Sequence, residues 1–389
     1  MKTRLNSSLN RSFKVVVKEN LLDIRDESHL SILDDRRVLI VTTPTVDKIY
    51  GDRMRQCLKS RSLVFEYRVL RLCESEKTIE NVERVCEWAL KHKLGRKDAL
   101  VAFGGGVCTD IVAFAASMIR RGISHVRIPT TLIGQIDAGI GIKGGVNFRK
   151  KKNILGCFHP PEAVFIDKTF LATLRNRYIR QGLAEILKVA VVADRHLYEA
   201  VRAHGSELVE SRFQHPQDVS HSVISRSISR TLEELQDNPF EDRTLERLLD
   251  FGHTFSPILE EKSEFTISHG EAVAIDMALS CVLAAELGIM AAKYRDNFIE
   301  LLESLGLPIW SPLVSPELCA AAIRQTTSHR GGALNLVVPM RIGEAGFVRS
   351  SARINRQVIQ NSIDFLSGAG WKKPSVEFAS IEKNQQLLM

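Results

Sequence analysis

The sequence predicts two structural parts, an α/β domain with a parallel sheet followed by a domain built of helices. Between residues 38 and 106, apolar runs of strand length alternate with segments that have the apolar spacing of a helix. Beyond about residue 173, almost every long segment has helical spacing. Strands that alternate with helices along a chain indicate a parallel sheet with helices on both faces.

The elements of the first part follow one another at short intervals. Predicted strands cover residues 38–43, 62–70 and 99–106, and predicted helices cover residues 46–60 and 78–95. The first strand, VLIVTT, is a continuous apolar run of the kind found in buried strands. The second helix ends at Gly95. The third strand runs into Gly104, Gly105 and Gly106, and this arrangement is typical of a Rossmann-like nucleotide-binding domain.

The character of the sequence changes after residue 139. The stretch GIKGGVNFRKKKN (141–153) is polar, flexible and rich in Gly and Lys, so we do not expect it to form a core element. Helical spacing then covers residues 180–194, 220–237, 243–261, 269–289 and 294–307. We predict a nucleotide-binding α/β domain over 13–174, an all-α domain over 175–370, and flexible tails at 1–12 and 371–389.

Composition restricts the possible classes of protein. The chain has 389 residues, of which 44% are hydrophobic and 25% charged, as expected for a globular protein of two domains. The net charge of +7 could reflect a nucleic-acid partner, a phosphorylated substrate or only a solvated surface, but no aromatic-interleaved basic stretch accompanies it. Seven scattered cysteines, no signal-peptide core and no run of eighteen apolar residues favour a cytoplasmic protein without membrane or nucleic-acid partners.

The three consecutive glycines are one signal for nucleotide binding. Between a strand and a helix, bare backbone can approach a pyrophosphate, and the helix N-terminus supplies N–H donors. Asp110 follows one turn into this helix. The spacing is not G-x-G-x-x-G, and glycine-rich turns are common. Glu74 and Lys77, at the start of the preceding helix, could hold ribose hydroxyls or be solvated charges.

Glu185, His253 and His269 are the main signal for a metal site. Each histidine lies in a glycine-flanked motif, FGHTF or SHGEA. Two imidazoles and one carboxylate suit zinc, with the fourth position left for substrate oxygens. The histidines are sixteen residues apart, so only the tertiary fold could bring them together, and structural roles remain the alternative. Lys188 shares a helix face with Glu185, and a structural ion pair between them is equally open.

Lysines beside glycines are candidates for anion binding. Lys143 precedes Gly144 on bare backbone, where a side chain is placed to reach a ligand. The basic run from Arg149 to Lys152, next to Asn153, could bind an anion or remain a solvated loop.

Taken together, these motifs resemble those of the dehydroquinate synthase-like sugar-phosphate cyclases. The likeness keeps one order from about Val38 to Gly343, through GGGVCTD, RIPTTLIGQIDAGIGIK, GVNF, GLAEILK, DFGHTFSP and HGEAVAIDMALSCVLA. Such a co-linear set is far more specific than any single motif. The resemblance implies the fold of that family, a homodimer, and dependence on NAD and on Zn²⁺ or Co²⁺. It also implies a reaction that proceeds by transient oxidation, β-elimination of phosphate, reduction and intramolecular aldol closure.

The resemblance further implies a role for each matching residue. The metal-ligand positions are Glu185, His253 and His269. The NAD-binding positions are Glu74, Lys77, Gly105, Gly106, Asp110, Thr130, Thr131 and Lys152. The catalytic positions are Asp137, Lys143, Lys188 and Asp250. The substrate-phosphate positions are Lys143, Lys152, Asn153, His329 and Arg121, the last of which the family contributes across a dimer interface.

Some positions depart from the pattern of the family. Cys73 stands where a Gly usually precedes the adenosine-site Glu, and Gly144 follows Lys143 where Thr is usual. The first strand ends in Thr42 and Thr43 instead of an acidic residue, so one nucleotide contact is in doubt.

Within the family, HTFSP and GCFHPP are most similar to the 2-epi-5-epi-valiolone synthases, which cyclise sedoheptulose 7-phosphate. Dehydroquinate synthases typically have a phosphate-site His where this chain has Pro257. The alternatives are a desmethyl-4-deoxygadusol synthase, an epimeric valiolone synthase, a 3-dehydroquinate synthase or, from another class, a metal-dependent polyol dehydrogenase. We expect a role in secondary metabolism, but the sequence leaves the product stereochemistry, the native metal and the pathway open.

Overall fold

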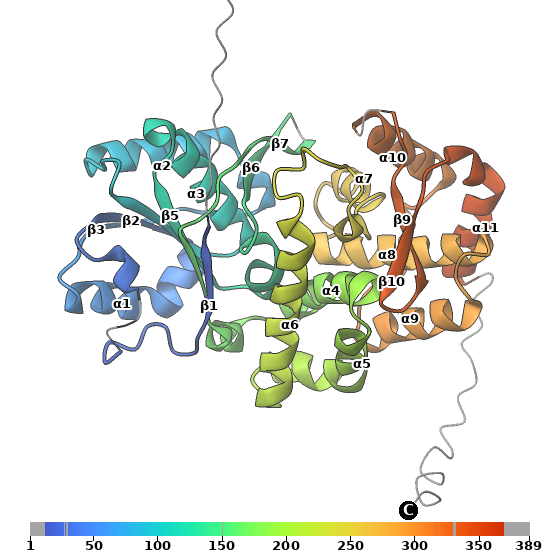
Figure 1. Ribbon diagram of the computed structural model, residues 1–389, viewed down its shortest axis with the longest axis horizontal. Helices are drawn as coiled ribbons and strands as arrows, with labels where there is room; N and C mark the ends of the chain where they lie inside the picture. The colour runs from blue at the N-terminus through green and yellow to red at the C-terminus, as the bar shows by residue number, and fades with distance from the viewer. Residues whose placement is uncertain (1–11, 27, 29, 150, 330–331, 369–389) are drawn as a thin grey trace, which may run out of the picture.

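The computed structural model describes residues 12–368 apart from 27, 29, 150, 330 and 331. The predicted tails therefore lie outside the described residues, except for Ser12, and so does Lys150 of the basic run. An α/β part and a mainly helical part lie side by side (Figure 1). The predicted fold class is confirmed, whereas the boundary between residues 174 and 175 stays a prediction.

Six parallel strands form the central sheet of the α/β part. Their order across the sheet is β1 (Lys14–Val17), β8 (Ala163–Ile166), β5 (Ser124–Pro129), β4 (Ala99–Gly104), β2 (Arg37–Thr42) and β3 (Val64–Val69). The three strands predicted between residues 38 and 106 correspond to β2, β3 and β4. Because all strands are parallel, their carboxyl ends meet at one edge, where such sheets bind ligands.

The central strands are apolar on both faces because helices cover both. Val38 and Ile40 of β2 belong to the layer that contains α1 (Pro44–Ser60). The alternate residues Leu39 and Val41 pack in the opposite layer, with α2 (Ile79–Lys91) and α3 (Gly106–Met118). Successive strand residues point to opposite faces, so one continuous apolar run supplies both layers.

A hairpin occupies the stretch that was predicted to be flexible. β6 (Lys143–Phe148) pairs antiparallel with β7 (Lys151–Phe158), and Val146 is fully buried. The prediction was wrong because the glycines here permit close packing. A Cβ at Gly144 would lie 2.7 Å from Ala113 Cβ of α3, and one at Gly145 would lie 2.8 Å from the Leu155 carbonyl oxygen.

The second part is built around one buried helix. Its helices are α4 (Asn176–Ala193), α5 (Arg195–Glu210), α6 (Gln217–Gln236), α7 (Ser256–Lys262), α8 (His269–Glu286), α9 (Ala292–Ser304), α10 (Pro316–His329) and α11 (Arg356–Leu366). Every residue of α8 from Ala272 to Ala284 is buried, so this helix has no solvent face over that length. A single antiparallel hairpin, β9 (Leu336–Arg341) with β10 (Glu344–Val348), is added to the predicted helices.

Short helical segments join these elements. The 3-10 segments are η1 (Ser31–Leu33), η2 (Glu74–Glu76), η3 (Ile119–Arg121), η5 (Lys168–Thr173), η6 (Leu248–Asp250) and η7 (Ser351–Arg353). One π-helix, η4 (Gly134–Ala138), follows β5 at the carboxyl edge of the sheet. π-helical turns are rare and are often found at functional sites.

The helix predicted over residues 243–261 is wrong for most of its length. Only η6 and α7 are regular there. Gly252 adopts a φ of +75°, and a Cβ at this position would lie 2.9 Å from Met277 Cγ. The left-handed backbone and the close approach to α8 explain why the chain leaves the helical path just before His253.

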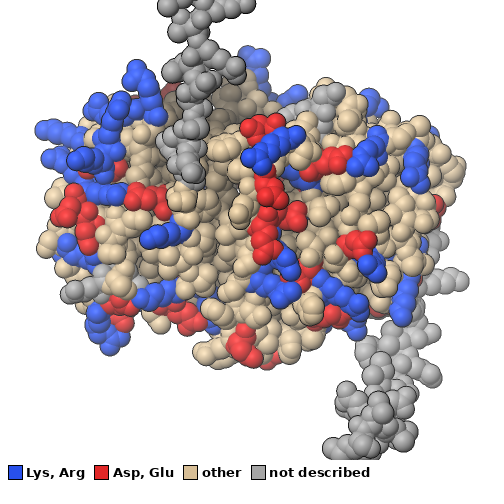
Figure 2. Space-filling model, in the orientation of Figure 1, with Lys and Arg blue, Asp and Glu red and all other residues tan. Residues whose placement is uncertain are grey.

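Charged side chains cover both parts of the molecule on the face seen in Figure 2. Lys and Arg gather at the upper left, over the α/β part, and are interspersed with Asp and Glu elsewhere. Among the helices that the structure describes, none combines the length and the apolar character needed to cross a membrane.

Candidate active site

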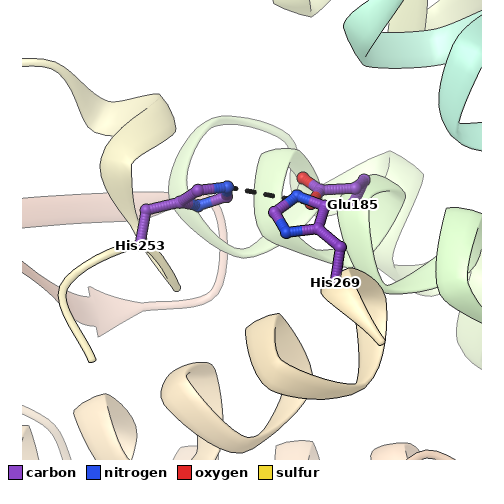
Figure 3. A group of neighbouring side chains, drawn as sticks. All are labelled: Glu185, His253 and His269. Carbon is purple, nitrogen blue, oxygen red and sulfur yellow. Dashed lines mark ion pairs between the residues drawn. The ribbon is translucent and has the colours of Figure 1, made fainter. Parts of the chain in front are cut away.

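Three side chains from distant parts of the sequence converge between α4, α8 and the segment before α7. Glu185 comes from the middle of α4, His269 is the first residue of α8, and His253 precedes α7. Each offers one ligand atom, and these atoms lie within 4.8 Å of one another. The Nε2 atoms of His269 and His253 lie 3.1 and 3.8 Å from Glu185 Oε1. Figure 3 shows both imidazoles directed at the carboxylate, so the structure brings the three predicted metal ligands together.

The other nitrogen of each imidazole has its own acceptor. His269 Nδ1 lies 3.0 Å from Glu260 Oε1, and His253 Nδ1 lies 3.1 Å from the Phe251 carbonyl oxygen. In a neutral imidazole, an Nδ1–H that donates to such a partner leaves Nε2 unprotonated and directed into the cluster. Metal-binding histidines are typically oriented in this way.

Local structure fixes both histidines. Ser268 and Glu271 form a capping box at the start of α8, with the Ser268 N–H donating to Glu271 at 2.9 Å, and this holds His269 in the first turn. Asp276, buried on α8, accepts hydrogen bonds from the backbone N–H groups of Phe255 and Ser256. The segment that carries His253 is thereby tied to the helix that carries His269.

The donor set and its charge fit a divalent metal ion. Both carboxylate oxygens of Glu185 are buried, and each faces cationic or imidazole partners: Oε2 the Lys188 ammonium, and Oε1 the two histidines. Burial would raise the pKa of Glu185, but the Lys188 ammonium and the two imidazoles lower it well below its ordinary value. Burial and Lys152 lower the pKa of His269, but the carboxylates of Glu260 and Glu185 outweigh them and raise it to about 9. The pocket therefore favours a cation, and two nitrogens with one carboxylate are a donor set that zinc prefers.

Lys188 links the metal cluster to the carboxyl edge of the sheet. Its Nζ lies 2.7 Å from Glu185 Oε2 and 3.2 Å from Oδ2 of Asp137, which lies in the π-helix. Burial lowers the pKa of Lys188, but the two carboxylates outweigh it and raise the pKa above its ordinary value, so the ammonium keeps its charge. The ion pair between Glu185 and Lys188 is therefore present, and the catalytic role of Lys188 stays a prediction.

The β6–β7 hairpin brings a second link to the cluster. Lys152 Nζ donates to Glu260 Oε2 at 2.7 Å, and Glu260 in turn contacts His269. The next residue, Asn153, accepts a hydrogen bond from Lys77 Nζ at 2.6 Å. Neighbouring residues of one strand therefore face the metal cluster and the predicted nucleotide site.

The predicted nucleotide site lies at the carboxyl ends of β4 and β5. Lys77 Nζ is also paired with Asp110 Oδ2 of α3 at 2.6 Å. No side chain caps the start of α3, so its first N–H groups are available to an anion. A Cβ at Gly105 would lie 3.1 Å from Thr131 Cγ2, and Thr130 N–H donates to the Gly104 carbonyl, so glycine keeps this turn narrow. These features fit the approach of a dinucleotide pyrophosphate.

Lys143, the first residue of β6, belongs to a separate charged group. It forms an ion pair with Glu241, which also pairs with Arg247, and Arg247 Nη2 lies 2.5 Å from Asp250 Oδ1. Although its side chain is 53% exposed, desolvation of the ammonium among these charged residues and the nearby Arg247 lower the pKa of Lys143 to about 8. An amine with this pKa can exchange a proton near neutral pH.

Two predicted phosphate ligands are not placed in the cluster by any described contact. Arg121 is exposed at the end of η3, with a φ of +68°. His329 is the last residue of α10, and its side chain lies outside what the structure describes. Their roles stay predictions.

The structure also shows residues that sequence reasoning missed. Glu260 and Glu261 are adjacent, and nothing in the sequence indicates which one turns inward. Asn147, within the quoted GVNF motif, donates through Nδ2 to the backbone and side-chain oxygens of Glu74, each at 3.0 Å. Its Oδ1 accepts the Asn153 N–H at 3.0 Å, so it joins the hairpin to η2. A signal for Asn147 was present in the motif, but its partners are far away in sequence.

Comparisons with known proteins agree with this geometry. The sequence model of the 3-dehydroquinate synthase N-terminal family matches residues 68–181, and that of the C-terminal family matches residues 182–327. The 2-epi-5-epi-valiolone synthase of Streptomyces glaucescens is 40% identical over 361 residues, which cover 92% of each chain. A 3-dehydroquinate synthase of Thermoanaerobacter sp. (strain X514) is 33% identical over 338 residues, covering 86% of this chain and 93% of that protein.

A solved structure is similar over nearly the whole molecule. It is that of ValA, a 2-epi-5-epi-valiolone synthase from Streptomyces hygroscopicus subsp. jinggangensis 5008 with NAD⁺ and Zn²⁺ bound. The two structures align with a TM-score of 0.90 and 41% sequence identity, covering 94% of this chain and 99% of ValA. Family models, relatives and fold all lead to one conclusion: this chain belongs to the 3-dehydroquinate synthase family.

Proposed function

We propose that this protein is an NAD- and metal-dependent sugar-phosphate cyclase that converts sedoheptulose 7-phosphate into 2-epi-5-epi-valiolone and releases phosphate. One observation carries the proposal: a continuous series of contacts joins the metal cluster to the nucleotide site. It runs from Glu185 through His269, Glu260 and Lys152 to the adjacent Asn153, and from there to Lys77 and Asp110. A substrate held at the metal would therefore lie beside both a hydride acceptor and basic side chains.

The cofactors have defined places in this site. Glu185, His253 and His269 would hold Zn²⁺, with Co²⁺ as the alternative, and the glycine turn with Thr130, Thr131, Glu74, Lys77 and Asp110 would hold NAD. When bound, NAD would accept and later return a hydride, and the metal would polarise the hydroxyl group that loses it.

The remaining roles belong to side chains of this chain. Lys152, Asn153 and Lys143 would bind the phosphate and stabilise the charge that develops on it as it leaves. Lys188, fixed between two carboxylates, would orient Asp137 and Glu185 with respect to the substrate. Lys143, with its pKa near 8, would move a proton at its ammonium nitrogen, and Asp250 would bind substrate hydroxyls.

Pro257 favours a substrate with a neutral polyol chain over a substrate that carries a carboxylate. It lies in the first turn of α7, four residues after His253, and is half-buried. A proline has no side-chain donor for a phosphate or a carboxylate. Leaving a carboxylate desolvated without a partner costs several kcal/mol, roughly enough to reject such a substrate by orders of magnitude.

Phosphate release and product mass test the proposal directly. Purified protein with NAD and Zn²⁺ should release one phosphate per sedoheptulose 7-phosphate and form a product of the mass of 2-epi-5-epi-valiolone. The carboxylated substrate of 3-dehydroquinate synthases should not react. Comparable turnover of both substrates would reject the assignment within the family, and NADH accumulation without phosphate release would favour a polyol dehydrogenase.

We further propose that the protein is a cytoplasmic homodimer of secondary metabolism. The support is indirect: the cysteines are unpaired in the described chain, and Arg121 is exposed, as a residue that reaches a partner subunit must be. Light scattering coupled to size-exclusion chromatography should give twice the mass of the chain. Complementation between inactive Arg121 and Glu185 variants would test whether the subunits share a site.

A further inference from the structure

The guanidinium group of Arg127 is fully buried in β5, yet none of its described hydrogen bonds goes to a carboxylate. Its Nη1 donates to the carbonyl oxygens of Ala138 at 3.4 Å, Gly139 at 3.2 Å and Gly141 at 2.8 Å, and its Nη2 donates to that of Lys143 at 2.9 Å. A buried charge is retained only where polar groups compensate for lost hydration. The charge of the Asp110 carboxylate contributes to this compensation, but the described hydrogen bonds come from backbone carbonyls and one imidazole.

That imidazole belongs to His125. Arg127 Nε donates to His125 Nε2 at 3.2 Å, and His125 stacks on His159 with ring centroids 5.2 Å apart. Burial and the neighbouring Arg127 lower the pKa of His125 well below its ordinary value, so this acceptor stays neutral. The guanidinium is therefore held from behind by a rigid pair of rings and presents its other N–H groups in a fixed direction.

The carbonyls that Arg127 binds lie at the end of the π-helix and in the link to β6. Helix ends leave carbonyl groups without intrahelical partners, and inside a protein these need donors. The turn is also tight, because a Cβ at Gly139 would lie 2.2 Å from the Gly134 carbonyl oxygen. The backbone from residue 138 to residue 143 thus depends on Arg127 for its shape.

Two predicted catalytic residues flank this segment. Asp137 lies in the last turn of the π-helix, and its carboxylate contacts Lys188. Lys143 is the first residue of β6, and its own carbonyl accepts from Arg127. The spacing between the two side chains is therefore set by the four carbonyls that one guanidinium holds.

We propose that Arg127 is a positioning residue that fixes Asp137 and Lys143 relative to each other and to the metal cluster. The inference rests on the proposed function, since both flanking roles belong to it. Arg127 does not contact the metal ligands or the glycine turn through any described hydrogen bond. Its loss should therefore reduce the rate of the chemical step more than the binding of either cofactor.

Arg127→Lys and Arg127→Met test the proposal. Lysine keeps the charge but cannot reach four carbonyls in a planar fork, and methionine keeps only the bulk. A misplacement of supporting groups typically costs about 10- to 100-fold in activity. We expect kcat to fall by about that factor in Arg127→Lys and further in Arg127→Met, while bound zinc and the Kd of NAD stay as in the wild type. Hydrogen exchange over residues 134–148 should become faster in both variants.

Arg36→Met is the matched control. Arg36 precedes β2 at the amino edge of the sheet, and it pairs with Glu162 at 2.6 and 2.9 Å, so its loss should lower Tm without changing kcat. The proposal is overturned if folded Arg127→Lys keeps the wild-type kcat, or if Arg36→Met with an equal fall in Tm loses as much kcat. If wild-type protein releases no phosphate from any sugar phosphate, the proposed function fails, and hydrogen exchange still decides whether Arg127 orders the segment.

Discussion

Replacing Glu260 with glutamine should weaken metal binding without changing any metal ligand. Glu260 is 2% exposed and joins His269 Nδ1 at 3.0 Å to Lys152 Nζ at 2.7 Å. Glutamine has nearly the same shape but no charge. Its amide can accept from only one of the two donors with its oxygen, and its NH₂ group would face the other donor.

The expected size of the effect of Glu260→Gln follows from the electrostatics of the metal-free site. Burial would raise the pKa of Glu260, but His269 and Lys152 lower it from 4.5 to about 2. A shift of this size corresponds to roughly 3 kcal/mol in favour of the ionised carboxylate, an upper bound for what the charge contributes. Since the folded pKa is depressed, this stabilisation is present above pH 4.5 and is lost as pH falls towards 2. Loss of a hydrogen-bonded partner of a ligating histidine typically costs about 10- to 100-fold in metal affinity.

The assay is a competition for Zn²⁺ against a chromophoric chelator at pH 7.5, followed by turnover at saturating metal. We expect the Kd of Zn²⁺ in Glu260→Gln to rise by about 10- to 100-fold and kcat to stay reduced when the metal is restored, because Lys152 also loses its partner. Glu261→Gln makes the same change at the next residue, which has no hydrogen bond to His269 or Lys152, and should behave as wild type. Wild-type zinc affinity in Glu260→Gln would refute the reasoning.

Three further predictions concern the same site. Glu185→Ala, His253→Ala or His269→Ala should each abolish turnover and deplete bound metal, and full activity in a metal-free His269→Ala protein would end the metal hypothesis. The KM for the sugar phosphate should rise as pH passes through 8, because Lys143, with its pKa lowered to about 8, loses its charge there; in Lys143→Arg this alkaline rise should disappear. During turnover, absorbance from NADH should not grow in step with substrate loss, since the hydride is returned in each cycle; steady growth would contradict a cyclase.

The regular elements could be predicted where local sequence decides the outcome. The apolar run VLIVTT predicts a buried strand, and its residues pack in the apolar layers on both faces of the sheet. Strands in the middle of a parallel sheet typically have such continuous apolar runs. The prediction failed at 141–153 and at 243–261 because tertiary contacts decide there. Gly144 is close to Ala113 of α3, and Gly252 is close to Met277 of α8, and neither neighbour is visible from the local pattern.

In the candidate site, too, local sequence indicates some features, and tertiary contacts decide the others. The types of its residues could be recognised, and the resemblance to a family supplied their roles, but periodicity could not show that residues 185, 253 and 269 meet within 4.8 Å. The inward turn of Glu260 and the buried guanidinium of Arg127 depend on packing between elements that are far apart in sequence.

Charge balance connects the metal to the phosphate. Around the cluster, three carboxylates (Glu185, Glu260 and Asp137) face two lysines (Lys188 and Lys152). Without a metal, the imidazolium of His269, whose pKa is raised to about 9, balances the remaining negative charge at neutral pH. A divalent ion bound in place of that proton would make the group net positive, and a positive site attracts a phosphate dianion. The metal would thus contribute to binding the leaving group as well as to polarising a hydroxyl.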